Sequence, residues 1–586
     1  MDLFSVLTLI GGLALFLFGM NYMGDSLKKL SGSKLEMILS KLTSNRFKGF
    51  LLGFGVTAVI QSSSATMVML VGFVNSGIMK LAQTTSVLMG ANIGTTVTGW
   101  LLSTAGISGS NIVLQLLKPS SFTPVLAVVG IVFNMFSKSD KRKNVGSILL
   151  GFAILMFGME TMSSATEGLQ DSPLFMDLLV KLSNPFLGIV AGTLFTAIIQ
   201  SSSASVGILQ ALSLTSVIPI SSALPVILGM NIGAALPPIL SSISGNRDAK
   251  RVAASCVYIK IISVLATVAV IYGLNAVFSF EFLGYRSSTF SIAFMHTAFN
   301  VVSTAALMPF CKVIEKLSEM TFKGGSSSQP SDVFESLDVR FLNYPAFATE
   351  QARELTVQMA HLTEESVNTA LSLTTEYSDK SRELIKKQEE TIDMYEDRLD
   401  AYLVALTGRQ ITISESLSIS TLLHIISYVE RISDHACKLS DTAKEMSKRN
   451  IELSKSATAE IKVISNAVSE IVGLTVTAIR DKDIKPALRI ESLSRVITAL
   501  SREMRTNHLT RVQNNECNTE FGFVFSNLLN NLVRIADHCQ NIAVYILQQE
   551  ESSTFSLHEY KSQMHGDDKS LSQNYFDDYV KKYTLA

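Results

Sequence analysis

The sequence contains little cysteine, and none of it lies in a CxxC pair. This scarcity argues against a disulfide-stapled domain and against a zinc site, and it is typical of a chain in a reducing compartment. A Walker loop is also missing, and no nucleophile stands beside a base in a recognisable motif, so we expect neither an ATP-driven pump nor an enzyme. The five cysteines are Cys256, Cys311, Cys437, Cys517 and Cys539.

The chain also has little net charge, −1 in total, but this balance hides two unlike halves. Residues 1–320 carry 20 Lys and Arg against 12 Asp and Glu, whereas the remainder carries 29 against 38. This division predicts a domain embedded in the lipid bilayer, followed by a charged, water-soluble helical domain. We expect no nucleic-acid partner. Long apolar runs of the first half are 3–23, 81–103, 252–278 and 289–311.

A duplicated unit builds the first half. Residues 43–96 align on 182–235 without a gap, with 19 identities in 54 positions. A register held over that length indicates two copies, repeat 1 at about 1–137 and repeat 2 at about 144–315. Landmarks at the constant offset of 139 residues are Gly19 and Gly158, Gln61 and Gln200, and Asn92 and Asn231.

Loop charge gives the two copies opposite orientations. Residues 25–48 carry six Lys and Arg against Asp25 and Glu36, whereas the equivalent 164–187 carries three acids against Lys181 alone. Because basic loops stay in the cytoplasm, the repeats are predicted to be inverted. Inverted repeats are the plan of many secondary transporters, whose substrate site lies at the repeat interface.

Each copy carries a polar QSSS block inside an apolar segment. The segments 49–77 and 188–216 are split by these blocks into pieces of about a dozen residues, each roughly 18 Å long and too short to cross a ~30 Å bilayer core. We therefore predict two re-entrant hairpins that enter from opposite faces and meet near the bilayer midplane. Their returning half-helices are expected to open at Ala65 and Ala204.

The QSSS blocks predict an anion site. Serine caps a helix N-terminus, and such a terminus directs N–H groups and partial positive charge at an anion. Glutamine and backbone carbonyls suit an alkali cation, and the later GANIGTT and GMNIGAA segments predict a second break in each repeat. Small residues often serve helix packing alone, but the duplication favours a binding site. The candidates are Gln61, Ser62, Ser63, Ser64, Asn92, Gln200, Ser201, Ser202, Ser203 and Asn231.

With the QSSS blocks, GANIGTT and the segment HTAFN at 296–300, most of residues 1–315 resembles the sodium–phosphate cotransporter family of the type II kind. The resemblance implies that both QSSS motifs line a phosphate and sodium site, with sodium ions as co-substrate. It adds Thr95 and Thr96 to the site. Repeat 2 departs from the pattern, because Ala234 and Ala235 stand where repeat 1 has these threonines.

Two ionisable side chains lie inside apolar runs. Lys260 stands eight positions past Val252, and we expect it to snorkel to a nearby basic loop. His296 stands one turn before Asn300. Two interpretations stay open for it: a functional histidine in the membrane, or a neutral ring bonded to Asn300.

The second half predicts a helical bundle, because long amphipathic patterns run from about 345 to 548 almost without Pro or Gly. ERISDHACKL at 430–439 matches VRIADHCQNI at 533–542 at an offset of 103, which predicts two three-helix units. This part resembles PhoU, a helical phosphate-signalling protein with E/DxxxD metal motifs.

That resemblance implies a divalent or ferric ion on clustered carboxylates. An ordinary solvated charged face is the alternative, and Val533 replaces the first acid of the second copy. Phosphate-signalling proteins are implied as partners, and a homodimer is compatible with the pattern. The candidate ligands are Asp393, Glu396, Glu430 and Asp434.

The sequence therefore predicts an all-α protein, with a polytopic membrane domain of two inverted repeats with re-entrant helical hairpins and a cytoplasmic PhoU-like helical bundle. The expected function is sodium-coupled symport of inorganic phosphate across a plasma membrane, the bacterial inner membrane. The alternative is a membrane phosphate receptor that signals without transport. The predicted parts are the membrane domain 1–320, a linker 321–344, the PhoU-like domain 345–548 and a poorly ordered polar tail 549–586.

Overall fold

The computed structural model is helical over the residues it describes, apart from one isolated bridge between Pro219 and Arg286. The chain forms two units, residues 1–341 and 342–586, and each is treated by itself. The all-α class predicted from the sequence is confirmed. The described residues are 3–31, 45–107, 119–166, 173–215, 218–324, 333–409, 411–451, 453–481, 484–514, 519–551 and 567–585.

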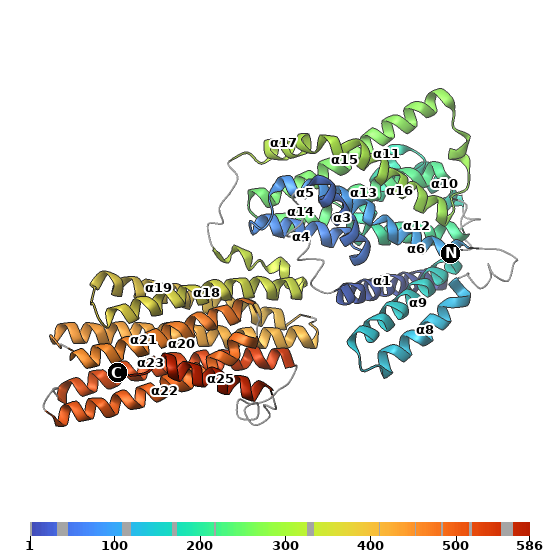
Figure 1. The fold of residues 1–586 in the computed structure, drawn as a ribbon. Coiled ribbons are helices and arrows are strands. Elements are labelled where there is room, and N and C mark those ends of the chain that lie inside the picture. Colours follow the sequence, from blue (N-terminus) through green and yellow to red (C-terminus); the bar gives the residue numbers. More distant parts are fainter. Residues whose placement is uncertain are drawn as a thin grey trace. The chain divides into compact units, whose positions relative to one another are not determined.

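Helices of the first unit follow the duplication (Figure 1). Helices of one repeat have counterparts 139 residues away in the other. In both repeats the helix is broken at the QSSS block and again just after the NIG motif. The helices are α1 (Leu3–Ser31), α3 (Arg46–Ile60), α4 (Ser63–Asn75), α5 (Leu81–Gly94), α6 (Thr96–Ser103), α8 (Pro119–Phe136), α9 (Asp140–Ala165), α10 (Pro173–Leu182), α11 (Pro185–Ile199), α12 (Ser202–Thr215), α13 (Ile220–Gly233), α14 (Leu236–Ser242), α15 (Arg247–Phe278), α16 (Thr289–Leu307) and α17 (Cys311–Thr321), with short 3-10 turns at Thr104–Gly106, Glu281–Gly284 and Met308–Phe310.

Glycines let the paired helices of each repeat approach closely. A Cβ at Gly53 would overlap the carbonyl oxygen of Val87, and a Cβ at Gly192 would overlap that of Val226 in the same way. These pairs are related by the offset of 139 residues, so α3 packs on α5 as α11 packs on α13. The duplicated sequence therefore folds into duplicated packing.

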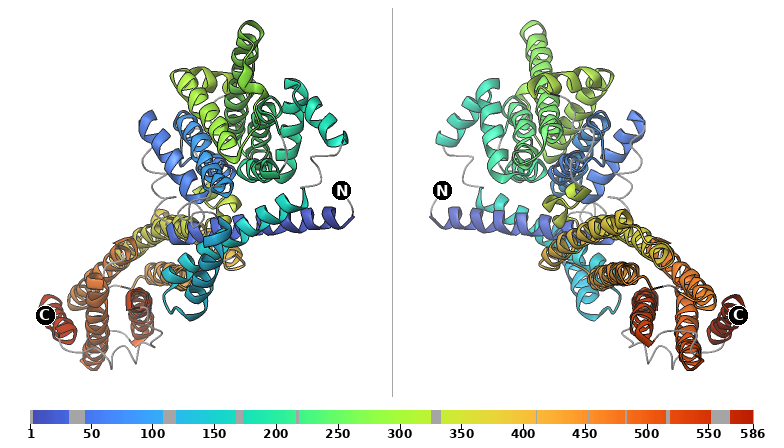
Figure 2. Two further views of the ribbon diagram at one scale, coloured as in Figure 1. Left: turned by 90° about the vertical axis from the view of Figure 1, so that its right-hand side faces the viewer. Right: turned by 90° about the vertical axis from the view of Figure 1, so that its left-hand side faces the viewer.

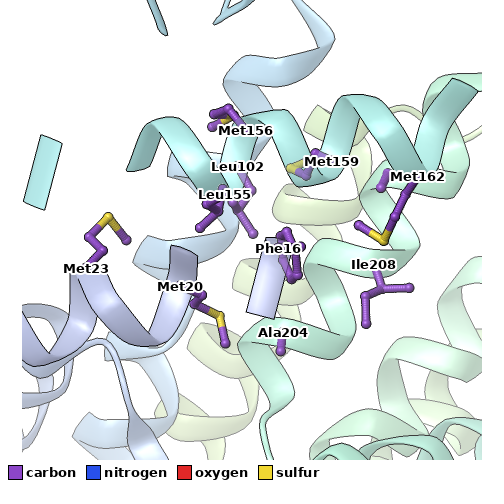
Figure 3. Packing of buried hydrophobic residues seen from close by; sticks show 11 residues of the cluster. Phe16, Met20, Met23, Leu102, Leu155, Met156, Met159, Met162, Ala204 and Ile208 are labelled. Carbon is purple, nitrogen blue, oxygen red and sulfur yellow. The ribbon is translucent and has the colours of Figure 1, made fainter. Parts of the chain in front are cut away.

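Helices α1 and α9, which are equivalent in the two repeats, lie side by side (Figure 1 and Figure 2). Their contact is reciprocal: a Cβ at Gly19 would overlap the backbone of Leu155, and a Cβ at Gly158 would overlap the backbone of Phe16, the residue equivalent to Leu155. Figure 3 shows Phe16 among side chains of α6, α9 and α12, including Ala204. This cluster fixes the helix that follows the second QSSS block.

Six helices of the described residues are long and apolar enough to cross a membrane. Five of them lie in the first unit: Leu3–Leu30, Lys141–Ala165, Ile220–Ser242, Arg247–Phe278 and Thr289–Thr321. A bent pair, Phe175–Leu182 with Pro185–Ile199, passes the same test with an angle of 107° between its helices. The sixth, Lys455–Asp481, belongs to the second unit, where it packs against other helices of the bundle.

The second unit consists of long helices that run side by side (Figure 1). Helices α18, α19 and α20 pack together, and so do α21, α22 and α23. Because α20 also packs on α23, the matched segments 430–439 and 533–542 lie against each other. The two three-helix units predicted from the sequence are thus present. The helices are α18 (Pro345–Leu373), α19 (Asp379–Thr407), α20 (Ile413–Lys448), α21 (Lys455–Asp481), α22 (Ile484–Gln513), α23 (Thr519–Glu551) and α25 (Asp567–Lys582).

The structure differs from the sequence prediction at the tail. The expectation of poor order is wrong for residues 567–585, because α25 packs on α22. Lys582 binds Glu470 at 2.7 Å, and Tyr583 donates to the same carboxylate. Paired charges and aromatic rings on one side of this short helix give it an anchored face, although its composition is polar.

The end of the predicted linker is also folded. Two 3-10 turns, Val333–Ser336 and Val339–Asn343, follow the undescribed residues 325–332. Asp338 accepts from Asn75 at 2.9 Å, and the Phe341 ring stands 5.5 Å from that of Phe73. Residues 333–341 therefore belong to the first unit and pack on the end of α4.

Candidate substrate site

Each QSSS block ends one helix and begins the next. Gln61 and Gln200 adopt the left-handed conformation, with φ of 57° and 61°, and their backbone N–H groups bond to Thr57 and Thr196 at 2.7 Å. A left-handed residue breaks the helix at the glutamine, as a C-terminal cap does. Both blocks thus produce the same turn, without a glycine.

The first serine of each block caps the returning helix. Ser62 Oγ accepts from the Ala65 N–H at 3.2 Å, and Ser201 Oγ accepts from the Ala204 N–H at 3.3 Å. The returning helices therefore begin two residues earlier than the alanines predicted from the sequence. As a result the remaining serines lie in the first helical turn, where backbone N–H groups have no partner within the helix.

The two tips touch, as the sequence predicts. Ser64 Oγ donates to the backbone oxygen of Gln200 at 3.3 Å, across 136 residues of sequence. On the second tip Ser201 and Ser203 lie within hydrogen-bond distance, with their Oγ atoms 3.3 Å apart. Ser63 and Ser202, the middle serines, are both buried. One small region thus receives two helix N-termini and a group of hydroxyls.

The second break of each repeat packs beside its tip. A Cβ at Gly94 would meet Thr57, and one at Gly233 would meet Thr196, which are four residues before Gln61 and Gln200. Thr95 lies between α5 and α6 and is buried. The remaining predicted residues at these breaks are also buried, and they are Asn92, Thr96 and Asn231.

Several buried polar atoms around the tips lack a hydrogen-bond partner. They include the side-chain oxygen of Gln61 and the hydroxyls of Thr95 and Thr196. Both ring nitrogens of His296 are in the same state, although the ring is only 1% exposed. Buried polar groups are normally paired, so these atoms mark a place where a polar ligand would complete the bonding.

His296 does not follow the interpretation in which its ring bonds to Asn300. The Asn300 amide donates instead to the backbone oxygen of His296, at 2.8 Å. The His296 ring belongs to α16, which packs on both α5 and α6, the two helices that Thr95 separates. The structure therefore excludes a bond between the His296 ring and Asn300, and a functional role of His296 stays a prediction.

Lys260 corrects the sequence prediction. Its side chain does not snorkel: the residue is 4% exposed, and its ammonium donates to Asn92 Oδ1 at 3.2 Å. The physical reason is that Lys260 lies on the face of α15 that packs against α5. Its side chain therefore points across to α5 and does not extend along α15 toward the basic loop. A single signal in the sequence pointed to this site, namely a lysine in a long apolar run that contains no carboxylate.

In the second unit the predicted carboxylates come together on α19 and α20. Burial and, after it, the nearby charges of Asp434, Glu396 and Asp393 together raise the pKa of Glu430 to about 7. Within the described residues, however, no group of three His, Cys, Asp or Glu side chains has the arrangement to hold a metal ion. The four acids therefore repel one another, and the metal site stays a prediction.

The matched histidines of the bundle also meet. His435 and His538 stack with their ring centroids 5.4 Å apart, and His435 Nδ1 lies 2.9 Å from Asn531 Oδ1. Burial, followed by the charge of His435, lowers the pKa of His538 to about 4. These rings lie where the two three-helix units meet, and Nδ1 of His538 is buried there without a hydrogen-bond partner.

Comparison with known proteins gives the family. The family model for the Na+/Pi-cotransporter matches residues 15–164 and 169–304, and the family model for the PhoU domain matches 356–443 and 461–546. Together the two models match most of the chain.

The chain is 20% identical over 550 residues to the "Putative inorganic phosphate export protein YjbB" of Salmonella typhimurium, which covers 93% of this chain and 98% of that protein. It is 36% identical over 105 residues to the sodium-dependent phosphate transport protein 2A of Rattus norvegicus, over 16% of each chain. The crystal structure of PhoU from Pseudomonas aeruginosa matches with 20% identity and a TM-score of 0.33, covering 35% of this chain and 97% of that one. The chain is therefore a multi-pass membrane protein that belongs to the Na+/Pi-cotransporter family of phosphate transporters and carries a PhoU domain.

Proposed function

We propose that this protein is a sodium-coupled symporter of inorganic phosphate. The contact between the two QSSS tips carries the proposal, because the bond from Ser64 to Gln200 holds the first turn of α4 against the turn that leads into α12. A tetrahedral oxyanion needs many donors on several sides. Two half-helix termini and their hydroxyls supply such donors without a fixed negative charge.

Sodium coupling follows from the same chemistry. Moving a phosphate ion out of water is costly in a low-dielectric site unless cations accompany it. The unpartnered oxygens of Gln61, Thr95 and Thr196 are hard ligands of the kind that an alkali cation prefers. The family description and the rat relative, which is named as sodium-dependent, support this choice.

Alternating access is proposed to come from inverted repeats. The reciprocal contact of Gly19 with Leu155 and of Gly158 with Phe16 supports this, because equivalent helices cross there in opposite directions. Two copies of opposite orientation would let one site open to either side of the membrane. Relatives whose name speaks of export are compatible with a symporter, since gradients set the direction of net flux.

We place the protein in the plasma membrane, the bacterial inner membrane, with the PhoU domain in the cytoplasm. The basic segments 25–48, 137–143 and 245–251 support that orientation. The PhoU domain is proposed to restrain transport, with phosphate-signalling proteins as partners. A divalent or ferric ion on Glu430 and its neighbours is proposed as its ligand, since a cation would relieve their repulsion.

Radiolabelled phosphate uptake into proteoliposomes tests the proposal. We expect accumulation only with an inward sodium gradient. Ser63→Ala and Ser202→Ala should each raise the phosphate concentration needed for half-maximal uptake about 10-fold or more, because each removes a donor to a charged ligand. Ser164→Ala, an exposed serine of α9, is the control and should leave uptake unchanged.

Two results would contradict the proposal. Phosphate uptake that does not depend on the sodium gradient would contradict sodium coupling. Binding of phosphate without accumulation would favour the receptor that signals through its helical domain.

A further inference from the structure

The position of Lys260 along its helix is fixed by two contacts between α15 and α4. At one end the Asn246 N–H donates to Asn75 Oδ1 at 2.8 Å, and at the other Cys256 Sγ lies 3.4 Å from Met67 Sδ. The two helices are therefore antiparallel neighbours. Because Lys260 lies one turn beyond Cys256, it stands level with the turn before Met67, which is the first turn of α4 and contains the buried serine of the first QSSS tip.

The charge of Lys260 has no counter-charge in its surroundings. The side chain is 4% exposed, and its one hydrogen bond goes to the neutral amide of Asn92. Over the residues that the structure describes, no carboxylate forms an ion pair with it. Burying an ammonium group without an opposite charge is costly, so an anion brought in by another molecule would relieve that cost.

The groups near Lys260 are suited to an oxyanion. His296 lies on α16, which packs on both α15 and α5, and its two ring nitrogens are unpaired at 1% exposure. Thr95, three residues after Asn92, has an unpaired hydroxyl. Cys256 is the other titratable group that interacts with the lysine. All of these groups are neutral or basic, and a negatively charged ligand would leave none of them in conflict.

We propose that Lys260 is an anion-binding residue of the substrate site, where its ammonium group supplies a built-in positive charge to the bound phosphate ion. This inference rests on the proposed function. It assigns one countercharge to the protein itself, which a coupling ion would otherwise supply. Asn92 positions the lysine by accepting its hydrogen bond, and the α4 N-terminus approaches the same anion from the side of the serines.

Phosphate binding by the purified full-length protein tests the inference. Equilibrium binding of radiolabelled inorganic phosphate is measured at saturating sodium in detergent, for the wild type, Lys260→Met and Lys250→Met. Methionine nearly keeps the volume of lysine and removes the charge. We expect Lys260→Met to bind phosphate about 30-fold more weakly or worse. Lys250→Met is the control on the same helix, ten residues away, and should bind as the wild type does.

A sodium titration adds a readout that a merely structural role would not move. With one positive charge missing, Lys260→Met should need higher sodium for the phosphate it still binds, and its melting temperature should not fall, since a buried charge has been replaced by an apolar group. Equal phosphate affinity in Lys260→Met and wild type would overturn the inference. Where the methionine variant does not fold, Lys260→Arg against Lys260→Gln decides: binding kept by arginine and lost by glutamine supports the inference, and equal binding refutes it.

These outcomes separate the inference from the function on which it rests. A wild type that binds no phosphate refutes the proposed function itself. A wild type that binds phosphate with sodium, beside a Lys260→Met variant that does the same, refutes only the role of Lys260.

Discussion

Glu430 is a half-buried carboxyl among other carboxyls, and its pKa of about 7 has consequences for stability. Burial is the largest cause, and the charges of Asp434, Glu396 and Asp393 add to it. Since the folded pKa lies above the ordinary value of 4.5, the folded state binds the proton more tightly. The resulting stabilisation is fully present below pH 4.5 and is lost as the pH rises through about 7.

Glu430→Gln should therefore stabilise the α19–α20 region at pH 8 and have little effect at pH 5. The gain is expected to be about 1 kcal/mol or less, since the group is partly solvated, which corresponds to roughly fivefold slower local opening. Hydrogen–deuterium exchange of α19 and α20 peptides in the full-length protein measures it. Glu383→Gln, an exposed glutamate of α19, is the control. Faster exchange in Glu430→Gln at pH 8 would show that the carboxylate is paired and not repelled.

Lys260 shows at the same scale what the sequence concealed. Its distance from a basic loop predicts snorkelling, because the side chain is long enough to reach that loop. The structure buries it against Asn92 instead. The direction in which a side chain leaves its helix depends on the neighbour packed there, and that neighbour is remote in sequence.

The paired helices α3 and α5 depend on glycine where their backbones meet. At Gly53 a Cβ would overlap the Val87 carbonyl oxygen, which cannot move away as a flexible side chain could, whereas at Gly55 there is nothing within 4 Å. Two glycines of one helix thus differ only in what they face. This contrast separates close packing from helix propensity.

Gly53→Ala should push α3 from α5 and displace the first QSSS tip. We expect a loss of about 1–3 kcal/mol of stability and little sodium-driven uptake. Gly55→Ala should be neutral or slightly stabilising, by about 0.5–1 kcal/mol, because alanine is the better helix former. Melting temperature in detergent and phosphate uptake are the measurements. The same loss in both alanine variants would show that the glycines matter for flexibility and not for contact.

At the scale of the whole molecule, residues 333–341 are the last residues before the second unit, and they bond directly to helices of the candidate site. Asp338 accepts from Asn75 at the end of α4, and Asn75 also bonds to Asn246, the residue that caps α15. Arg340 binds Asp338 at 2.6 Å and donates to the backbone oxygen of Ser241 at 3.0 Å. A pull on this segment would reach the helices that carry the first QSSS tip and Lys260.

Deletion of residues 342–586 should raise the initial rate of sodium-driven uptake, by about twofold or more, if the second unit restrains transport. Full-length Asp338→Ala should reproduce part of the increase, because it breaks the attachment and keeps both units. Uptake into proteoliposomes, normalised to protein inserted, measures both. Unchanged rates and unchanged response to internal phosphate in the deletion would rule out the restraint.

The sequence by itself determined the features that depend on neighbours along the chain. Four polar residues in an apolar run break a helix because the left-handed glutamine ends it and the first serine caps the next, and both copies do so in the same way. The offsets of 139 and 103 residues likewise determined that each unit is a duplication. Local hydrogen bonds and helical periodicity are sufficient for these features.

Only the tertiary structure decided which remote groups meet. The bond from Ser64 to Gln200 spans 136 residues, the lysine reaches an asparagine 168 residues away, and the supposed linker and tail pack as ordered segments. Such contacts depend on the register and rotation of one helix against another, which glycine contacts and core packing set together. The sequence pattern of a single helix contains neither, so the burial of Lys260 against Asn92 became visible only in the folded protein.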